Sequence, residues 1–206
     1  MMRWLRWLLA LLAITFAAPI LMLISIWCGL PSLDGLVDEH PEVKIETVPA
    51  VLKQAILAAE DAHFYEHHGI ASSTITLQLV RQRFTFEDRQ PQRGLSELLL
   101  ALKIELNFSK DQILELYINK TFLGQRAYGF AAASQTYFGK PLDRISLAEA
   151  AILAGLPKAP SIFNPVVNPK RARQRQEYVL QRMLRAGMIN DEQFRQALEE
   201  PVHTRE

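Results

Sequence analysis

The sequence has 206 residues, of which 49% are apolar, and its 23 Lys and Arg residues against 22 Asp and Glu residues give a net charge of +1. The length suits one globular domain with an anchor, and the balanced charge excludes the basic surplus of a nucleic-acid-binding protein, so no nucleic-acid partner is expected. The single cysteine, Cys28, excludes an internal disulfide and a cysteine-based zinc site.

An apolar segment near the N-terminus predicts a membrane anchor, with residues 1–30 as a cytoplasmic tip and a transmembrane helix. The range from Trp7 to Leu30 contains no charged residue, and as a helix of about 36 Å it would cross a hydrocarbon core of about 30 Å. Arg3 and Arg6 precede it and acidic residues follow it, which predicts a single-pass protein whose remainder is extracytoplasmic. Pro19 is expected to kink the helix without preventing insertion. A cleaved signal peptide is the alternative, and the length of the apolar run favours the anchor.

The rest of the chain divides into a linker and a domain. Residues 31–48 contain Pro31, Gly35 and Pro41 and predict a linker with one short extended candidate at Val43–Ile45. Residues 49–206 predict a folded domain that is nearly all α-helical, because capping residues repeatedly precede amphipathic runs.

Helices are expected in succession through this domain. Thr47 can cap the first, with Pro49 in its first turn. Ser72 or Ser73 can cap a second, which runs through Arg83, and a third covers about 95–107 with leucines along one face.

The later helices have clearer boundaries. Ser109 with Gln112 and Ser146 with Glu149 form the capping-box pattern. Further helices are expected over 130–137 and 169–186, the latter ended by Gly187, and a short last helix follows 190. A proline-broken loop is expected over 157–165.

Two acidic sites are candidates for catalysis. Glu60 and Asp61 follow apolar residues at the end of the first domain helix, where desolvation would raise the proton affinity of a carboxylate, as suits a general acid or base. Solvated acids at an exposed helix end are the alternative. Glu97, among leucines of the third helix, either faces solvent or points into a groove. Two carboxylates that flank one cleft would suit chemistry at a glycosidic bond.

Two further helices carry polar groups that can meet an anionic ligand. Hydroxyl, amide and cationic side chains near a helix N-terminus suit phosphate and sugar, or form an ordinary polar surface. A basic helix farther along is either a membrane-facing or a solvated face. The first set is Ser73, Thr74, Thr76, Gln78 and Arg81, and the second is Lys170, Arg171, Arg173, Arg175, Arg182 and Arg185. The histidines lack the spacing of a metal site.

Taken together, five segments resemble, in order and spacing, the motifs of the peptidoglycan glycosyltransferases of family 51, which include the N-terminal half of class A penicillin-binding proteins. Five ordered motifs are specific, whereas one alone would not be. The segments are Glu60–Gly69, Ser73–Arg81, Arg93–Glu97 with Ala101–Glu105, Ser109–Asn119 with Phe122–Gly124, and Leu147–Pro160 with Asn164–Pro165.

The resemblance implies a lysozyme-like helical domain that polymerises lipid II at the outer face of a bacterial inner membrane. Glu60 would be the general base that takes the proton from the 4-hydroxyl of the acceptor sugar. The resulting oxygen would attack the anomeric carbon of the donor chain with inversion, forming a β-1,4 bond and releasing undecaprenyl pyrophosphate. Glu97 would be the second catalytic glutamate, near the donor pyrophosphate.

The resemblance also implies a set of substrate-binding residues. It requires no cofactor, although a divalent cation such as Mg²⁺ would suit the donor pyrophosphate. The partners it implies are lipid II, the growing glycan chain, membrane lipid and wall-synthesis proteins. The substrate-binding positions are Asp61, Phe64, His67, Ser73, Thr74, Gln78, Arg81, Arg93 and Asn119.

Some positions depart from the family pattern. Gly94 stands where the family usually carries Lys, Leu77 replaces the first of a Gln pair, and Gln82 replaces a usual Asn. Between the first and second motifs, around Ile70, the chain lacks the helix and mobile flap that the family places there. We expect weaker pyrophosphate binding and lower activity or processivity from the missing wall and the missing Lys.

Two other functions compete with the glycosyltransferase. A lytic muramidase of similar fold would cut glycan strands and would need neither the anchor nor the donor-site cations. A non-catalytic relative would bind wall-synthesis proteins; the shortened segment and Gly94 favour it, whereas the retained Glu60 and Glu97 favour an enzyme. The transpeptidase motifs Ser-x-x-Lys and Lys-Thr-Gly are lacking, so the sequence predicts a monofunctional enzyme or a fragment of a longer one.

Overall fold

The computed structural model describes residues 2–36, 42–67, 74–84 and 93–205, with residues 2–14 and Thr74 described by their backbone alone. Within these ranges the chain is helical and has no strand, apart from an isolated antiparallel bridge between Phe122 and Tyr128. The prediction of a mainly α-helical fold is therefore confirmed.

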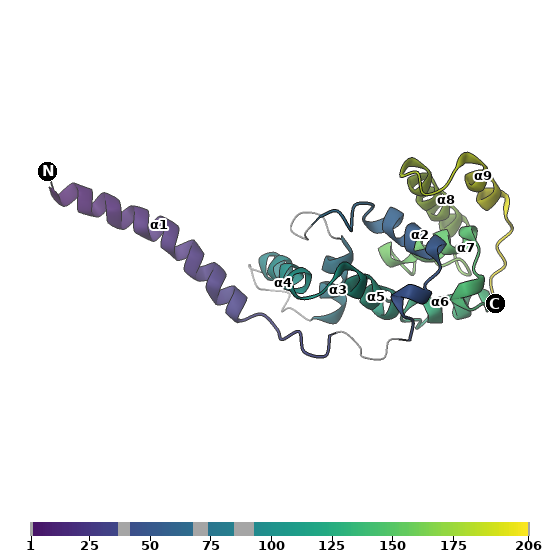
Figure 1. The fold of residues 1–206 in the computed structure, drawn as a ribbon, viewed down its shortest axis with the longest axis horizontal. Coiled ribbons are helices and arrows are strands. Elements are labelled where there is room, and N and C mark those ends of the chain that lie inside the picture. The colour runs from purple at the N-terminus through teal and green to yellow at the C-terminus, as the bar shows by residue number, and fades with distance from the viewer. Residues whose placement is uncertain (1, 37–41, 68–73, 85–92, 206) are drawn as a thin grey trace.

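The first helix, α1 (Met2–Cys28), projects from the rest of the molecule (Figure 1). It contacts α4 (Arg93–Asn107), and just beyond it the ammonium group of Lys103 donates to the Pro31 carbonyl oxygen at 3.0 Å. Across the ranges given above, none of the helices has both the length and the apolar character that a membrane crossing requires. The membrane anchor stays a prediction from the sequence.

The segment that leads into the domain is held by a side chain. The N–H of Val43 donates to Asn119 Oδ1 at 2.9 Å, and its carbonyl oxygen accepts from Asn119 Nδ2 at 2.8 Å. Ile45 begins a 3₁₀ turn, η1 (Ile45–Thr47). The prediction of an extended segment over Val43–Ile45 was therefore wrong for Ile45. At Val43, the Asn119 side chain pairs with the backbone N–H and C=O groups that a neighbouring strand would otherwise pair.

The first domain helix, α2 (Ala50–Glu60), begins later than predicted. Its N-cap is Pro49, and Val48 before it is extended, with φ −69° and ψ 128°. Because a residue that precedes proline avoids the helical region, the helix cannot extend back to Thr47. The predicted Thr47 cap is wrong, and the Thr47 hydroxyl instead donates to the Lys44 carbonyl oxygen at 2.8 Å.

The next helices, α3 (Thr74–Arg83), α4 and α5 (Lys110–Lys120), follow the predicted order. The capping box of α5 is confirmed, because Gln112 N–H donates to Ser109 Oγ at 3.2 Å and Ser109 N–H donates to Gln112 Oε1 at 2.8 Å. The predicted caps of α3, Ser72 or Ser73, lie outside the described residues.

The C-terminal half also agrees with the predicted boundaries. α6 (Phe130–Phe138) ends at Gly139, whose φ of +66° favours glycine. The predicted Ser146–Glu149 capping box opens α7 (Leu147–Gly155), and Asn190 with Gln193 forms a further box at the start of α9. The remaining elements are η2 (Leu142–Arg144), η3 (Leu156–Lys158), α8 (Pro169–Arg185) and α9 (Asp191–Glu199).

Two groups of helices form the core. α2 packs against α7 and α8, while α3 packs against α4 and α5. Leu52 and Ile56 on α2, and Ile75 and Leu79 on α3, are almost fully buried, and each such side chain contributes about 1.5–3 kcal/mol by leaving water. A hydrogen bond from Gln78 of α3 to Glu60 at the end of α2 links the two groups.

Candidate active site

Glu60 is held by a side chain from α3. The last residue of α2, it is half-buried, and its carboxylate accepts a short hydrogen bond from Gln78 Nε2. Gln78 Oε1 in turn accepts from the hydroxyl of Tyr117 on α5 at 3.1 Å. Tyr117 is fully buried, and because its hydroxyl donates, the amide oxygen of Gln78 faces Tyr117 and the amide nitrogen faces Glu60.

The surroundings of Glu60 favour proton acceptance. Burial raises the pKa of its carboxyl group, whereas the hydrogen bond from Gln78 and the charges of Arg175, Lys158 and Arg182 lower it, and the net direction is upward. A carboxylate with a raised pKa is a stronger base than one in water. The structure thus places Glu60 in the partly desolvated setting that its sequence context indicated.

Glu97 lies in a different electrostatic setting. It is 5% exposed, and its two oxygens accept from Arg81 Nε and Arg93 Nε, each at 2.8 Å. Burial raises the pKa of Glu97, but the two arginine hydrogen bonds outweigh it and the pKa is lowered overall. Glu97 therefore stays ionised and fixes two guanidinium groups, whose other N–H groups can meet an anionic ligand.

The helix α3 connects the two glutamates. Gln78 holds Glu60 and Arg81 holds Glu97, and residues three apart lie about one turn apart on the same face of a helix. The predicted residues Glu60, Glu97, Gln78, Arg81 and Arg93 are thus brought to one region of the molecule. The sequence could not show this convergence, because it depends on how α2 and α4 pack on α3.

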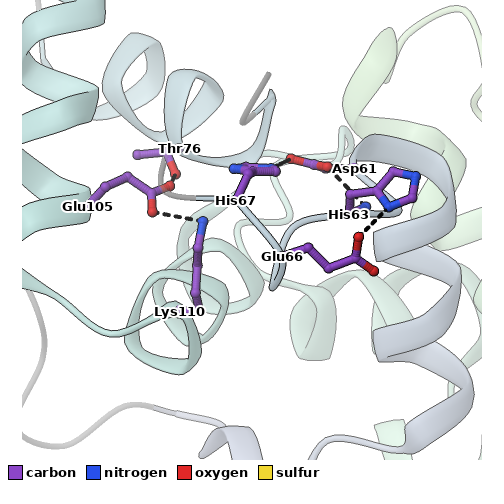
Figure 2. A network of polar contacts seen from close by, with 7 residues as sticks. All are labelled: Asp61, His63, Glu66, His67, Thr76, Glu105 and Lys110. Carbon is purple, nitrogen blue, oxygen red and sulfur yellow. Dashed lines mark hydrogen bonds and ion pairs between the residues drawn. The ribbon is translucent and has the colours of Figure 1, made fainter. Parts of the chain in front are cut away.

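A tight turn follows Glu60 and contains three of the other predicted site residues, of which Figure 2 shows Asp61 and His67. Asp61 is 7% exposed; its carboxylate contacts His67 Nε2 at 2.8 Å and accepts from the His63 N–H at 3.2 Å. Phe64 is fully buried, with the His67 ring edge-on to it. Asp61, Phe64 and His67 therefore shape the turn that positions Glu60, and substrate contact by them stays a prediction.

A buried ion pair supports this turn from the other side (Figure 2). Glu105 on α4 accepts from the Thr76 hydroxyl at 2.5 Å and lies 2.8 Å from Lys110 Nζ. The Lys110 ammonium group stands over the Phe64 ring, 4.3 Å from its centroid. Glu105 and Lys110 are not among the site residues predicted from the sequence. The only feature of the sequence that could have indicated them is that both lie within segments that match the family motifs.

The other predicted positions have different outcomes. Asn119 is engaged with the backbone of Val43 and also donates to the Glu115 carbonyl oxygen at 2.8 Å, so it secures the linker, and its predicted substrate contact stays untested. Ser73 lies outside the described residues, as does the side chain of Thr74.

Cations from the C-terminal half approach Glu60. Lys158 lies in η3, and Arg175 and Arg182 lie on α8; all three lower the pKa of Glu60. A Cβ atom on Gly155 would lie 2.7 Å from Arg175 Cγ, so glycine lets α8 pass close to the end of α7. The basic face of α8 is visible in the sequence, whereas its effect on Glu60 depends on the packing of α8 against α2 and α7.

The described residues form no site in which the protein alone would hold a divalent cation. Both oxygens of Glu97 accept from arginines, and like-charged guanidinium groups disfavour a metal ion beside them. In the portion of the chain that the structure describes, no group of three His, Cys, Asp or Glu residues is arranged to hold a metal ion.

Comparison with known proteins identifies the domain. A family model described as transglycosylase matches residues 71–184. Penicillin-binding protein 1A of Neisseria flavescens is 49% identical over 180 residues, covering 78% of this chain and 23% of that protein. A protein of Cupriavidus necator named as a transglycosylase is 48% identical over 198 residues, covering 85% of this chain and 86% of that protein.

A solved structure agrees with these sequence matches. The crystal structure of penicillin-binding protein 1A from Haemophilus influenzae matches with a TM-score of 0.52 and 36% identity, covering 83% of this chain and 19% of that chain. This chain thus spans about a quarter or less of the penicillin-binding proteins it matches, but 86% of the C. necator protein. By sequence match and fold together, the chain belongs to the transglycosylase family, whose domain acts in glycosyl transfer on peptidoglycan.

Proposed function

We propose that the chain polymerises lipid II into β-1,4-linked glycan strands and releases undecaprenyl pyrophosphate. The observation that carries the proposal is the partly desolvated Glu60 carboxylate, oriented by Gln78 and Tyr117. A base of this kind can take the proton from a sugar hydroxyl. Family membership supports glycosyl transfer as the reaction, and the substrate and stereochemistry are our inference.

In the proposed reaction, the acceptor 4-hydroxyl gives its proton to Glu60 as its oxygen attacks the anomeric carbon of the donor. The bond from that carbon to the pyrophosphate oxygen breaks, and the configuration inverts. Arg81 and Arg93 would stabilise the charge that develops on the leaving pyrophosphate, since fixed cations act most strongly where charge appears in the transition state. Glu97 would act by holding both arginines in place.

We also propose that the domain is tethered at the outer face of a bacterial inner membrane by the N-terminal segment. The support is the uncharged run from Trp7 to Leu30 and the large apolar side chains exposed on α1, namely Phe16, Ile20, Leu21, Met22, Leu23 and Ile24. Exposed apolar surface of this kind calls for an apolar partner. An alkaline phosphatase fused after residue 206 should be active in cells, whereas a fusion that is inactive and found in the cytosol would contradict the proposed topology.

A catalytically weak relative is the second candidate, and Gly94 favours it. Gly94 lies beside Arg93 on α4 and is exposed, so the family's usual lysine charge is missing next to one of the arginines. A chain that bound lipid II without polymerising it would fit a role as a partner of other wall-synthesis proteins.

The test is polymerisation of purified lipid II by the detergent-solubilised full chain, run beside Glu60→Gln. The control is Glu46→Gln, an exposed glutamate in η1. We expect glycan strands from the parent and the control, and loss of at least about 100-fold in rate in Glu60→Gln, as for removal of a general base. No strands from a folded parent that still binds lipid II would favour the second candidate.

A further inference from the structure

One face of α8 carries a row of arginines around a tyrosine. Arg175, Tyr178, Arg182 and Arg185 recur at intervals of three and four residues, which places them along one side of the helix. The opposite side of α8 packs into the core through a different set, Ala172, Gln176, Val179, Leu180 and Met183. The row therefore lies on the surface of the domain.

Tyr178 organises two of these arginines. The guanidinium carbon of Arg175 lies 4.6 Å from the Tyr178 ring centroid, and that of Arg182 lies 5.8 Å from it. Arg182 Nη1 also donates to the Tyr178 hydroxyl at 3.1 Å. Contacts of this kind hold a guanidinium group in place while leaving most of its five N–H donors unused.

Within the described residues, the arginines of this row are not held in ion pairs. Among the residues that the structure describes, neither Arg175, Arg182 nor Arg185 forms an ion pair with a carboxylate. Arg175 instead donates weakly to the Gly155 carbonyl oxygen at 3.4 Å. Three arginines on one face create a positive field that attracts an anion, and the charges of Arg175 and Arg182 also act on Glu60.

Two of these arginines, Arg182 and Arg185, line a pocket together with the turn that follows the candidate base. A cavity of about 340 Å³ is lined by Ala62, His63, Tyr178, Arg182, Arg185 and Ala186. Ala62 and His63 lie two and three residues after Glu60 in the chain, so the pocket adjoins the turn that follows the candidate base. In the lining, His63 Nδ1 contacts the Glu66 carboxylate at 2.8 Å.

We propose that this pocket binds a carboxylate of the peptide stem carried by the glycan substrate, held by Arg182 and Arg185 beside Tyr178. The inference rests on the proposed function, since lipid II has two kinds of anion, its pyrophosphate and its stem carboxylates. In the proposed mechanism Arg81 and Arg93 meet the donor's pyrophosphate, and the acceptor's own pyrophosphate is the competing anion that a probe without pyrophosphate excludes. A guanidinium group matches a planar carboxylate with two parallel hydrogen bonds.

The position of the site favours a substrate group over a membrane surface. The pocket is shallow, and two arginines and two alanines lie in its lining. The anchor is expected at the other end of the domain, because α1 contacts α4 and Figure 1 shows α8 and α9 at the end away from α1.

The test measures binding without turnover. The probe is a soluble disaccharide-peptide that lacks lipid and pyrophosphate, used with free stem carboxylates and with those carboxylates amidated. Calorimetry with the detergent-solubilised full chain should show about tenfold tighter binding of the free form, as for a charge-assisted hydrogen bond. Equal affinity for the two forms would overturn the proposal.

Substitutions in the pocket test whether it causes the preference for free carboxylates. Arg182→Gln and, separately, Arg185→Gln should each remove most of the preference for free carboxylates. Arg171→Gln, an equal loss of charge about 16 Å along the helix from Arg182, should retain it. If both pocket variants kept the preference, the carboxylate would bind elsewhere and the proposal would be wrong.

Two further arms separate the alternatives. Binding to phosphatidylglycerol vesicles tests whether the arginine row binds a membrane instead. If Arg182→Gln lost vesicle binding yet kept the preference for free carboxylates, the row would bind a membrane and the pocket proposal would be wrong. Polymerisation of lipid II is measured separately on the same samples. A parent that binds the free probe tightly but makes no strands would contradict the proposed function and leave the pocket supported.

Discussion

Glu60 and Glu97 are held by residues one turn apart on the same helix, Gln78 and Arg81 of α3. The two glutamates differ in pKa direction because their partners differ. Glu60 receives a neutral amide and its pKa is raised by burial, whereas Glu97 receives two guanidinium groups and its pKa is lowered. One helix thus holds one carboxyl group whose pKa is raised and another whose pKa is lowered, and paired catalytic carboxylates show this kind of separation.

Replacement of Gln78 by Leu should shift the pH dependence of polymerisation. The Gln78 hydrogen bond favours the ionised form of Glu60 and so lowers its pKa. Without this hydrogen bond the pKa of Glu60 rises further. Glu60 then becomes protonated at a higher pH than in the parent. We expect the acidic limb of the pH–rate profile to shift to higher pH, and the polymerisation rate at neutral pH to fall about tenfold.

The control for Gln78→Leu is Gln174→Leu, at an exposed position of α8. Tyr117→Phe should show a smaller shift in the same direction, because the amide of Gln78 loses the hydroxyl that fixes its orientation. An unchanged acidic limb in Gln78→Leu would show that Glu60 does not carry the titration that limits activity.

Glu60→Gln should stabilise the fold at neutral pH. A group whose pKa is raised in the folded state stabilises the fold most at a pH below its unfolded pKa. This stabilisation is lost as the pH rises through the folded pKa. At pH 7 the parent therefore holds a costly partly buried charge that Glu60→Gln lacks, and we expect a gain of about 1 kcal/mol in the free energy of unfolding.

The pH dependence of this gain identifies its cause. Near pH 4, below the ordinary glutamate value of 4.5, both proteins are neutral at this position and the difference should shrink towards zero. Thermal unfolding at the two pH values measures it, with Glu46→Gln as the exposed control. A gain of equal size at both pH values would mean that charge burial at Glu60 is not the reason.

Much of the fold could be predicted because its signals are local. The capping boxes at Ser109 and Ser146 each lie within four residues, and Gly139 ends its helix through its own backbone conformation. Thr47 failed as a cap because Pro49 constrains the residue before it, a local effect that outweighed the preference of threonine for helix starts.

The candidate site could be predicted only as a set of residues. Motif resemblance named Glu60, Gln78, Arg81 and Glu97, but which of them touch depends on the packing of α2, α3 and α4 on one another. Tyr117 gave no signal of its own, because a tyrosine in an amphipathic helix is usually a core residue. Its role appears only when its hydroxyl is seen to donate to Gln78.

Glu97→Gln should weaken both the fold and the donor site. A neutral amide cannot balance the charges of Arg81 and Arg93. Because these two side chains are 57% and 41% exposed, solvent screens the effect, and we expect the free energy of unfolding to fall by about 1–2 kcal/mol. Because the pKa of Glu97 is lowered, its contribution is present above its unfolded pKa and is lost as pH falls through its folded pKa.

Unfolding of Glu97→Gln is therefore compared with the parent at pH 7 and at pH 3. The difference should be larger at pH 7, and KM for lipid II should rise more than kcat falls if the arginines mainly bind pyrophosphate. A variant with parental stability at pH 7 would mean that the two ion pairs contribute nothing net to the fold.

Lys110→Met should destabilise the turn after Glu60. The side chain of Glu105 is 4% exposed and that of Lys110 is 17% exposed, so removal of the cation leaves a buried carboxylate without its counter-ion. We expect a loss of about 3 kcal/mol in the free energy of unfolding, and partial recovery in the double variant Glu105→Gln with Lys110→Met. Lys170→Met on the exposed face of α8 is the control, and additive losses in the double variant would contradict coupling.

Gly94→Lys should raise activity if the missing family lysine limits this enzyme. A Cβ at position 94 would meet no atom within 4 Å, so the helix α4 can accept a side chain without strain. Lysine also has a higher helix propensity than glycine, by about 0.5–1 kcal/mol. Gly94→Ala separates the two effects, since alanine brings the propensity gain without the charge. We expect both variants to be more stable than the parent, and only Gly94→Lys to polymerise lipid II faster. Equal rates in Gly94→Lys and Gly94→Ala would show that the charge beside Arg93 does not limit turnover and would direct attention to the shortened segment between the first two motifs.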